Sequence, residues 1–176
     1  TTGAFAEAGE QMDLDNFARY WNLQVYIDNK DWPGNNIKFW SSRAPGSKFR
    51  WILYDTDFGY GIYDHGAYRY PTLEFSQGAG DLHNWANPDW ATLLCRKLLE
   101  NNHFRNLFIN HAADMMNTVL QPHRSRTLID SLAALIENEI PYHFERWEEN
   151  PGTWNDHIWR MKSFMDRRIP YMQEQL

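Results

Sequence analysis

The sequence predicts a mostly α-helical fold that contains one small β-hairpin, which makes it an α+β protein. Three observations lead to this prediction. Apolar side chains recur at helical spacing in several segments. Two short aromatic and β-branched runs stand close together, as the strands of a hairpin do. The length of 176 residues is enough for one domain with a sizeable core.

The first predicted helix follows a polar stretch at the beginning of the chain. Residues 1–12 are small and polar, and we expect them to form a loose leader before a single domain of residues 13–176. Asp13 can cap a helix, and the residues after it repeat at helical spacing. The apolar residues in this repeat are Leu14, Phe17, Ala18, Trp21 and Val25. The helix should end near Ile27 or Asp28, because a Pro-Gly pair follows.

A β-hairpin and a long irregular segment are predicted next. The run NIKFW, residues 36–40, and the run FRWILY, residues 49–54, are separated by the turn-like sequence SSRAPGS. Residues 59–88 are rich in Gly, Tyr, Asn and Pro, which indicates a long loop, and loops of this length are often functional. We expect Trp85 and Trp90 to pin this loop to the helices.

The last half of the chain is predicted to form a helical bundle. Its apolar residues fall into three stripes at helical spacing: Trp90, Leu93, Leu94 and Leu98; Phe104, Leu107, Phe108, His111 and Met115; and Leu128, Leu132, Leu135 and Ile136. A break is expected at Pro141. Thr153 and Asp156 form a capping box that opens a fourth helix. The residues of this helix expected to point inward are Ile158, Met161 and Met165.

Composition excludes several classes of protein. The formal charge of −6 argues against nucleic-acid binding, which needs a basic face. The single Cys95 rules out an internal disulfide and a multi-cysteine zinc site, and its helical apolar surroundings indicate a buried thiol. The histidines show no paired metal spacing; we expect His65 and His83 in the loop and His111 in the core. No membrane span and no signal-peptide pattern is seen, so the sequence alone gives no localisation.

Two acidic clusters flank the predicted hairpin. In the first, DWPGNN, Asp31 and Asn36 stand five positions apart on either side of a rigid turn. The catalytic loop of protein kinases spaces its Asp and Asn in the same way; there the Asp accepts the proton of the acceptor hydroxyl and the Asn holds Mg²⁺. Asp28 is assigned instead to the end of the preceding helix. The first cluster is therefore a candidate for phosphoryl-transfer chemistry.

The second cluster, YDTDFGYG, follows the returning strand directly. If the extended conformation persists, Asp55 and Asp57 point to the same face. Two carboxylates on one face repel each other unless a cation lies between them, which favours Mg²⁺ or Mn²⁺ with oxygen ligands. Asp57 also begins an Asp-Phe-Gly triplet like that of kinases. From its position after the strand we favour Asp55 as the principal ligand and Asp57 as the second.

Other interpretations of these acidic residues are weaker or stay open. Asp and Asn are common in solvated turns, so it is the order of the two clusters around a hairpin that favours a site. A calcium-binding EF-hand starting at Asp28 fails, because Lys30, Trp32 and Pro33 stand where oxygen ligands and then Gly are needed. A glycosidase with paired carboxylates stays possible and depends on their separation in space.

The residues around both clusters resemble a known family. DLDNFARYWNLQVYIDNKDWPGNNIKFW, residues 13–40, and KFRWILYDTDFGYG, residues 48–61, closely resemble the CotH kinase family, the spore-coat protein H-like group. The DWPGNN form is similar to the bacterial, non-sporulating branch of that family. The match is specific over residues 13–61, and a looser one extends to about Trp147.

The resemblance implies an atypical protein kinase with a kinase-like C-terminal lobe, which transfers phosphate from ATP to secreted or surface proteins. It implies that Asp31 is the catalytic aspartate and that Asn36 and Asp55 bind the cofactor, ATP with Mg or Mn. It further implies that Asp57 joins Asn36 and Asp55 as a metal ligand. A secreted, cell-surface or envelope location is also implied.

One departure from the family pattern changes what is expected of this chain. Kinases carry an amino-terminal lobe, with a strand lysine that holds the α- and β-phosphates and with a covering loop. Before Asp31 the chain has only Lys30, on no plausible strand, and no Gly-rich loop. We therefore expect the carboxy-terminal half of such a kinase, inactive without its missing N-terminal lobe. The alternative is a non-catalytic surface module that binds protein or carbohydrate through its aromatics, and Mg-ATP binding distinguishes the two.

Overall fold

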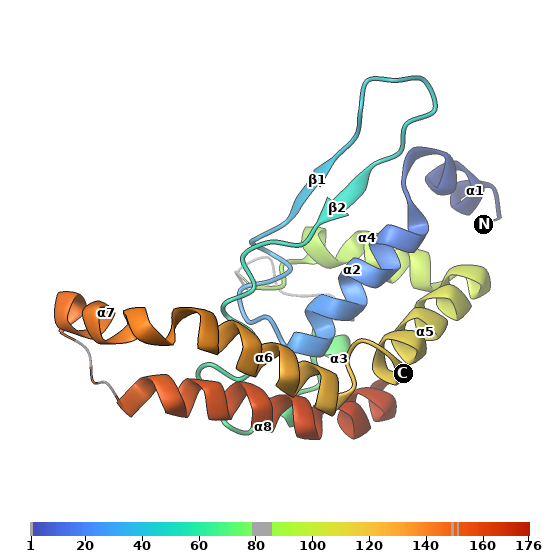
Figure 1. The fold of residues 1–176 in the computed structure, drawn as a ribbon. Helices are drawn as coiled ribbons and strands as arrows, with labels where there is room; N and C mark the ends of the chain where they lie inside the picture. Colours follow the sequence, from blue (N-terminus) through green and yellow to red (C-terminus); the bar gives the residue numbers. More distant parts are fainter. Residues whose placement is uncertain (1, 79–85, 149, 151) are drawn as a thin grey trace.

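The described chain folds into a group of α-helices from which one antiparallel pair of strands projects (Figure 1). The computed structural model describes residues 2–78, 86–148, 150 and 152–176. Of these residues 66% are helical, so the prediction of a mostly α fold with a small β-hairpin is confirmed. The elements are α1 (Thr2–Gln11), α2 (Leu14–Ile27), β1 (Lys38–Trp40), β2 (Arg50–Ile52), the 3₁₀ turn η1 (Ala67–Arg69), α3 (Thr72–Gln77), α4 (Asp89–Leu99), α5 (Asn102–Asn117), α6 (Pro122–Ile136), the 3₁₀ turn η2 (Glu137–Glu139), α7 (Ile140–Trp147) and α8 (Gly152–Gln175).

The beginning of the chain forms helix α1 rather than the loose leader that we expected. Phe5 packs against the core, and Met12, just beyond the helix, is buried. The backbone then joins the hairpin, because the Asp13 N–H donates to the Phe49 carbonyl at 2.9 Å. The prediction of a loose leader was wrong because the segment consists mainly of small and polar residues. Its few apolar side chains, which pack it against the core, gave too weak a signal in the sequence.

Helix α2 is the central element of the core. Its cap residue Asp13 accepts from the Asn16 N–H at 3.0 Å, and the helix ends at Asp28, whose backbone is left-handed with a φ of 55°. Both ends lie where the sequence predicts them, because both depend on local signals. The ring of Phe17 meets Trp51 of β2 edge-on, with centroids 4.7 Å apart. The core therefore extends from α2 to the base of the hairpin.

The hairpin is attached to the helices at one strand. Strand β1 pairs antiparallel with β2, with Lys38 opposite Ile52 and Phe39 opposite Trp51. Asn16 of α2 holds β2 through its side chain: Oδ1 accepts from the Trp51 N–H at 2.6 Å, and Nδ2 donates to the Trp51 carbonyl at 3.3 Å. The predicted hairpin is thus confirmed, with strands of three residues each that are shorter than the aromatic runs.

The segment that we expected to be a long irregular loop, residues 59–88, contains the turn η1 and the helix α3. His65 lies in an exposed loop, as predicted. The predictions for His83 and Trp85 lie outside the described residues. Trp90 is 63% exposed at the beginning of α4, so it does not pin the loop to the helices.

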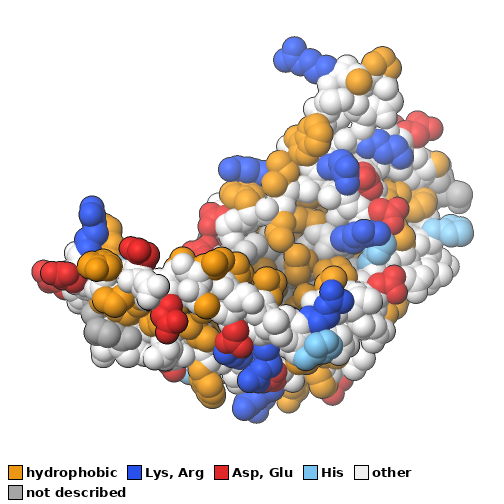
Figure 2. All heavy atoms as spheres, in the orientation of Figure 1, with side chains coloured by type: hydrophobic (Ala, Val, Ile, Leu, Met, Phe, Trp, Pro, Cys, Tyr) orange, Lys and Arg blue, Asp and Glu red, His pale blue; other side chains and the backbone are white. Residues whose placement is uncertain are grey.

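The predicted helices of the second half are present, but two of them turn a different face to the core. On α4 the predicted residues Leu93 and Leu94 are exposed, and the buried residues are Ala91, Thr92, Cys95 and Leu98. On α6 the whole predicted stripe is exposed: Leu128, Leu132, Leu135 and Ile136. Figure 2 shows apolar side chains along the hollowed face between the hairpin and α6. Apolar periodicity indicates that a helix forms, but it does not say on which side the neighbouring elements lie.

Helix α5 turns the predicted face to the core. Phe104 and Phe108 are buried, and the predicted buried thiol of Cys95 on the adjacent α4 is confirmed. His111, which we expected in the core, lies at its edge instead. Its Nε2 is 2.8 Å from Oδ1 of Asp15 on α2. This histidine therefore joins two helices through a polar contact.

The last two helices follow a break that the sequence predicts. The turn η2 separates α6 from α7 just before Pro141. Asn150, rather than Thr153, caps α8: Asn150 Oδ1 accepts from the Gly152 N–H at 2.9 Å, while the Thr153 hydroxyl donates to the Asn150 carbonyl at 2.8 Å. The capping box was wrong by about one turn, although Met165 is buried as expected. Neither α8 nor any other helix in the described part of the chain is long and apolar enough to cross a membrane.

A buried arginine joins α8 to the end of α2. Arg168 is 0% exposed, and its guanidinium donates five hydrogen bonds of 2.8–3.0 Å. The acceptors are the carbonyls of Val25, Tyr26, Tyr68 and Tyr70 and the hydroxyl of Thr72. The Thr72 hydroxyl in turn donates to the buried carboxylate of Asp28 at 2.7 Å. Three segments that are far apart in the sequence therefore meet at one buried cation.

Burial of Asp28 leads to a specific pH dependence of stability. Burial raises the pKa of the Asp28 carboxyl group, although Lys30, Thr72 and Arg168 favour its charged form, and Tyr70 also faces it. The folded protein thus keeps the Asp28 proton at pH values at which the unfolded chain has lost it. The contribution of this group to the free energy of unfolding therefore falls as the pH rises between the two pKa values. Relative to Asp28→Asn, the wild type should gain stability as the pH is lowered from neutral.

Urea unfolding of the wild type and of Asp28→Asn over a series of pH values measures this difference directly. Comparing the two proteins cancels the titration of all other carboxyl groups, which they share. Asp114→Asn, on the exposed side of α5, serves as the control and should follow the wild type. A difference between wild type and Asp28→Asn that stays constant with pH would contradict the prediction.

Candidate functional site

The structure places the predicted Asp and Asn of the first cluster in direct contact. Asp31 lies in the loop after α2 and Asn36 lies just before β1, and both are buried. The Asn36 amide donates to Asp31 Oδ2 at 2.5 Å, and the Asn35 amide lies 3.4 Å from the same oxygen. The spacing of five positions therefore brings the two side chains together.

The turn between these two residues is held in shape by Trp32. Its indole is fully buried, meets Trp21 edge-on with ring centroids 4.4 Å apart, and donates to the Tyr20 hydroxyl at 2.9 Å. The peptide bond that follows it is cis. Asn36 has a left-handed backbone with a φ of 54°, which Asn tolerates better than most residues. The turn is thus anchored to α2, and this anchor positions Asp31 and Asn36.

The second acidic cluster is fastened to the same end of α2. The Tyr60 N–H donates to the Ile27 carbonyl at 2.7 Å, and the Asn29 amide donates to the Asp55 carbonyl at 3.3 Å. Gly59 packs so closely that a Cβ atom there would lie 3.0 Å from the same Ile27 carbonyl. A larger residue at this position would push the two segments apart. Both clusters are therefore positioned by the C-terminus of one helix.

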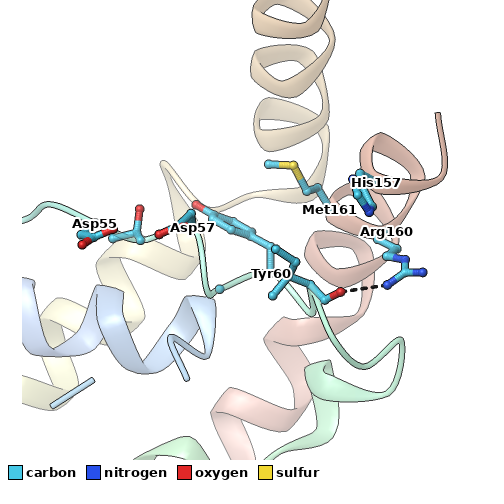
Figure 3. A pocket seen from close by; sticks show the side chains of 9 residues that line it. Asp55, Asp57, Tyr60, His157, Arg160 and Met161 are labelled. Carbon is cyan, nitrogen blue, oxygen red and sulfur yellow. Dashed lines mark hydrogen bonds between the residues drawn. The ribbon is translucent and has the colours of Figure 1, made fainter. Parts of the chain in front are cut away.

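The second cluster is not a continuation of strand β2. The strand ends at Ile52, and Asp55 has a left-handed backbone with a φ of 52°. The argument that an extended strand turns Asp55 and Asp57 to one face is therefore wrong. The two side chains nevertheless lie near each other, and Asp57 raises the pKa of the Asp55 carboxyl group (Figure 3).

Neighbouring carboxyl groups raise the pKa values of Asp31 and Asp55. The hydrogen bond with Asp57 is the main cause that raises the pKa of Asp55, and the negative charges of Asp57 and Asp31 add to it. Burial is the main cause that raises the pKa of Asp31, and the charge of Asp57 adds to it. Asp31 Oδ1 is buried and has no hydrogen-bond partner. The site thus gathers negative charge that a cation would neutralise.

These groups could hold a divalent cation together with ligands from outside the protein. Among the described residues, no group of three or more His, Cys, Asp or Glu is placed to bind a metal by itself. Mg²⁺ is usually held by one or two carboxylates, and phosphate and water oxygens complete its shell. The Asp55–Asp57 pair, with the amide of Asn36 in the neighbouring loop, fits such a shared site.

Lys38 is a residue of this site that the sequence analysis did not identify. It is the first residue of β1, and its ammonium lies 4.0 Å from the centroid of the Tyr54 ring. Its positive charge lowers the pKa of Asp55 and so opposes the effect of the acidic neighbours. A signal existed, since Lys38 stands two positions after Asn36 on a predicted strand. Kinases carry their strand lysine before the catalytic loop, so no lysine was expected here.

A pocket of about 580 Å³ opens beside the second acidic cluster (Figure 3). One wall is the loop that runs from Asp55 to Ile62, and the other is the first part of α8, which contributes His157, Arg160 and Met161. The Arg160 guanidinium joins the two walls by donating to the Ile62 carbonyl at 2.8 Å. These two residues are 98 positions apart, and no local pattern in the sequence links them.

Comparison with known proteins identifies the family of the chain. The family described as CotH kinase protein matches residues 2–172. This match includes α1 and most of α8, so it extends well beyond the two acidic clusters and the hairpin. Neither the curated proteins nor the solved structures gave a match. The chain belongs to the CotH kinase family.

Proposed function

We propose that this chain is the catalytic lobe of an atypical protein kinase that transfers the terminal phosphate of Mg-ATP to a hydroxyl group of a protein. The observation that carries the proposal is the contact between Asp31 and Asn36 beside the paired carboxyl groups of Asp55 and Asp57. Protein kinases use an Asp and an Asn of one loop, and an Asp after the following hairpin, as proton acceptor and metal ligands. Membership of a family described as kinase agrees with it.

Asp31 is the proton acceptor in this proposal. The acceptor oxygen bonds to the γ-phosphorus, the bond between that phosphorus and the bridging oxygen of the β-phosphate breaks, and ADP leaves. The hydroxyl proton passes to Asp31, whose Oδ1 has no other partner. The raised pKa of Asp31 brings it nearer to neutral pH, where proton acceptors work best. The Asn36 amide orients the carboxylate through its other oxygen, Oδ2.

The remaining residues of the site would bind the phosphates of ATP, either directly or through a metal ion. Asn36, Asp55 and Asp57 would hold Mg²⁺ or Mn²⁺, which neutralises the charge on the phosphate oxygens when it is bound. Lys38 is exposed next to Asp55 and can reach outward from β1. It would add a second positive charge, the contribution that other kinases obtain from a strand lysine.

The substrate that we propose is a secreted or surface protein, as the family resemblance implies. We also propose that the lobe depends on further structure to hold the nucleotide, because in the described residues no second sheet covers the acidic clusters. The 176-residue chain alone should then transfer little phosphate in a radioactive-ATP assay. Strong phosphorylation by this chain alone would contradict that part of the proposal.

Calorimetric titration of the full natural protein with Mg-ATP tests the proposed function. Binding should be lost in Asp55→Ala, because a metal ligand is gone, and retained in Asp31→Asn. Lys38→Met should weaken binding about 10- to 100-fold, the usual effect of losing a hydrogen bond to a charged group. Asp114→Asn, outside the site, is the control. If the unchanged protein does not bind Mg-ATP, the kinase proposal fails and a non-catalytic binding module is the better account.

A further inference from the structure

The pocket beside the acidic clusters combines polar side chains with an apolar surface. At one end lie the carboxyl groups of Asp55 and Asp57, which belong to the candidate site. Figure 3 shows Tyr60 between Asp57 and the Met161 side chain of α8. Ile62 and the backbone of Gly59 complete the same part of the wall. A group bound along Tyr60 would therefore extend from the acidic residues to an apolar surface.

The positive charge of the pocket is engaged in holding its walls together. Arg160 donates to the Ile62 carbonyl, and it also forms an ion pair with Asp156, with Nη2 and Oδ2 2.8 Å apart. Asp156 of the same helix thus largely neutralises the charge of Arg160. Arg160 therefore holds the two walls together and does not bind an anionic ligand. The surface formed by Tyr60, Ile62 and Met161, with His157 and Arg160 beside it, therefore favours an apolar side chain as its occupant.

The pocket lies on the side of the second acidic cluster that faces α8. Lys38, which we assign to the phosphates, lies on the side of the hairpin, which leaves the helices in another direction (Figure 1). In phosphoryl transfer the attacking and leaving oxygens lie roughly in line on opposite sides of the phosphorus. A nucleotide held on the hairpin side would accordingly place its acceptor on the α8 side.

We propose that this pocket binds the phosphoacceptor segment of the protein substrate. The acceptor hydroxyl lies next to Asp31, just beyond the end of the pocket formed by Asp55 and Asp57, and an apolar side chain of the same segment packs against Tyr60 and Met161. The inference rests on the proposed kinase function and adds the class of substrate sequence. A pocket of about 580 Å³ that combines the apolar surface of Tyr60, Ile62 and Met161 with polar side chains from both walls is typical of a specific binding pocket.

A degenerate library of Ser-, Thr- and Tyr-containing peptides, phosphorylated by the full natural protein with Mg-ATP, tests this inference. The wild type should prefer large apolar residues at one fixed position near the acceptor. Met161→Glu should abolish this preference and raise the KM for the best apolar peptide at least about tenfold, the effect of losing one apolar contact. The KM for ATP should not change. Leu132→Glu, an exposed leucine of α6 outside the pocket, is the matched control and should keep the wild-type preference.

A second variant tests the same inference if Met161→Glu does not fold. Met161→Trp keeps an apolar residue but fills the pocket, and it should raise the KM for peptides with large apolar residues more than for those with Ala at the same position. Thermal unfolding monitors both variants. Transfer without any apolar preference, or with a preference that both folded variants retain, overturns this inference alone. Absence of transfer by the wild type to every peptide overturns the proposed function as well.

Discussion

Phosphate transfer by the full natural protein should fall about 10²- to 10⁴-fold in Asp31→Asn, while Mg-ATP still binds. An asparagine has nearly the shape of the aspartate, and its side-chain oxygen can still accept from Asn36. What is lost is the ability to take the hydroxyl proton, because an amide is not basic. The variant therefore separates proton transfer from the shape of the site.

Initial rates with saturating Mg-ATP measure the effect, and calorimetry shows that the nucleotide still binds. Asp114→Asn makes the same chemical change on α5, away from the acidic clusters, and should keep the wild-type rate. Asp31→Asn that retains a third or more of the wild-type rate would exclude Asp31 as the proton acceptor. Combined loss of binding and rate would instead assign Asp31 to the metal or the nucleotide.

The second large effect concerns stability and comes from Arg168→Met. Removing the guanidinium takes one donor from each of four carbonyls and one hydroxyl, of which the Val25 and Tyr70 carbonyls keep a backbone N–H donor. It also removes a buried positive charge whose attraction favours the charged form of Asp28. Breaking a buried charge network from one side typically costs about 3–5 kcal/mol, a large part of the stability of a domain of this size. We expect the midpoint of urea unfolding to fall accordingly.

The neighbouring Arg167 provides the control. Arg167 is exposed and lies over the ring of Tyr68, with the guanidinium carbon 5.3 Å from the ring centroid. Arg167→Met makes the same change one position earlier and should cost no more than about 1 kcal/mol. If the two variants unfold at similar urea concentrations, the buried network around Arg168 does not stabilise the fold as described.

Features that depend on local signals were predicted well. The ends of α2 follow from Asp13 and from the Pro-Gly pair, and the hairpin follows from two aromatic runs on either side of a turn. The contact between Asp31 and Asn36 also depends on a few consecutive residues, because Trp32 anchors the turn between them. In each case the residues that specify the feature are neighbours in the chain.

Features that depend on distant segments were not predicted. The apolar stripe of α6 indicated a helix, but α6 packs mainly on α8 through residues such as Ile129 and leaves that stripe exposed. The pocket wall on α8 and the role of Arg168 arise only when α8 folds back against α2 and the second acidic cluster. Strand alternation does not bring Asp55 and Asp57 near each other, because the left-handed backbone of Asp55 interrupts the extended chain.

The position of α8 has one consequence for the precision of the site. Met161 in the pocket wall and Arg168 at the end of α2 belong to one continuous helix, and seven residues correspond to a rise of about 10 Å. The length of α8 between Met161 and Arg168 therefore fixes the distance between the pocket and the end of α2 to which both acidic clusters are attached. Inserting one residue between Met161 and Arg168 would rotate Met161 by about 100° around the helix axis relative to Arg168. Lengthening an exposed loop would not change this distance. Changing the length of α8 would shift the pocket relative to the acidic clusters.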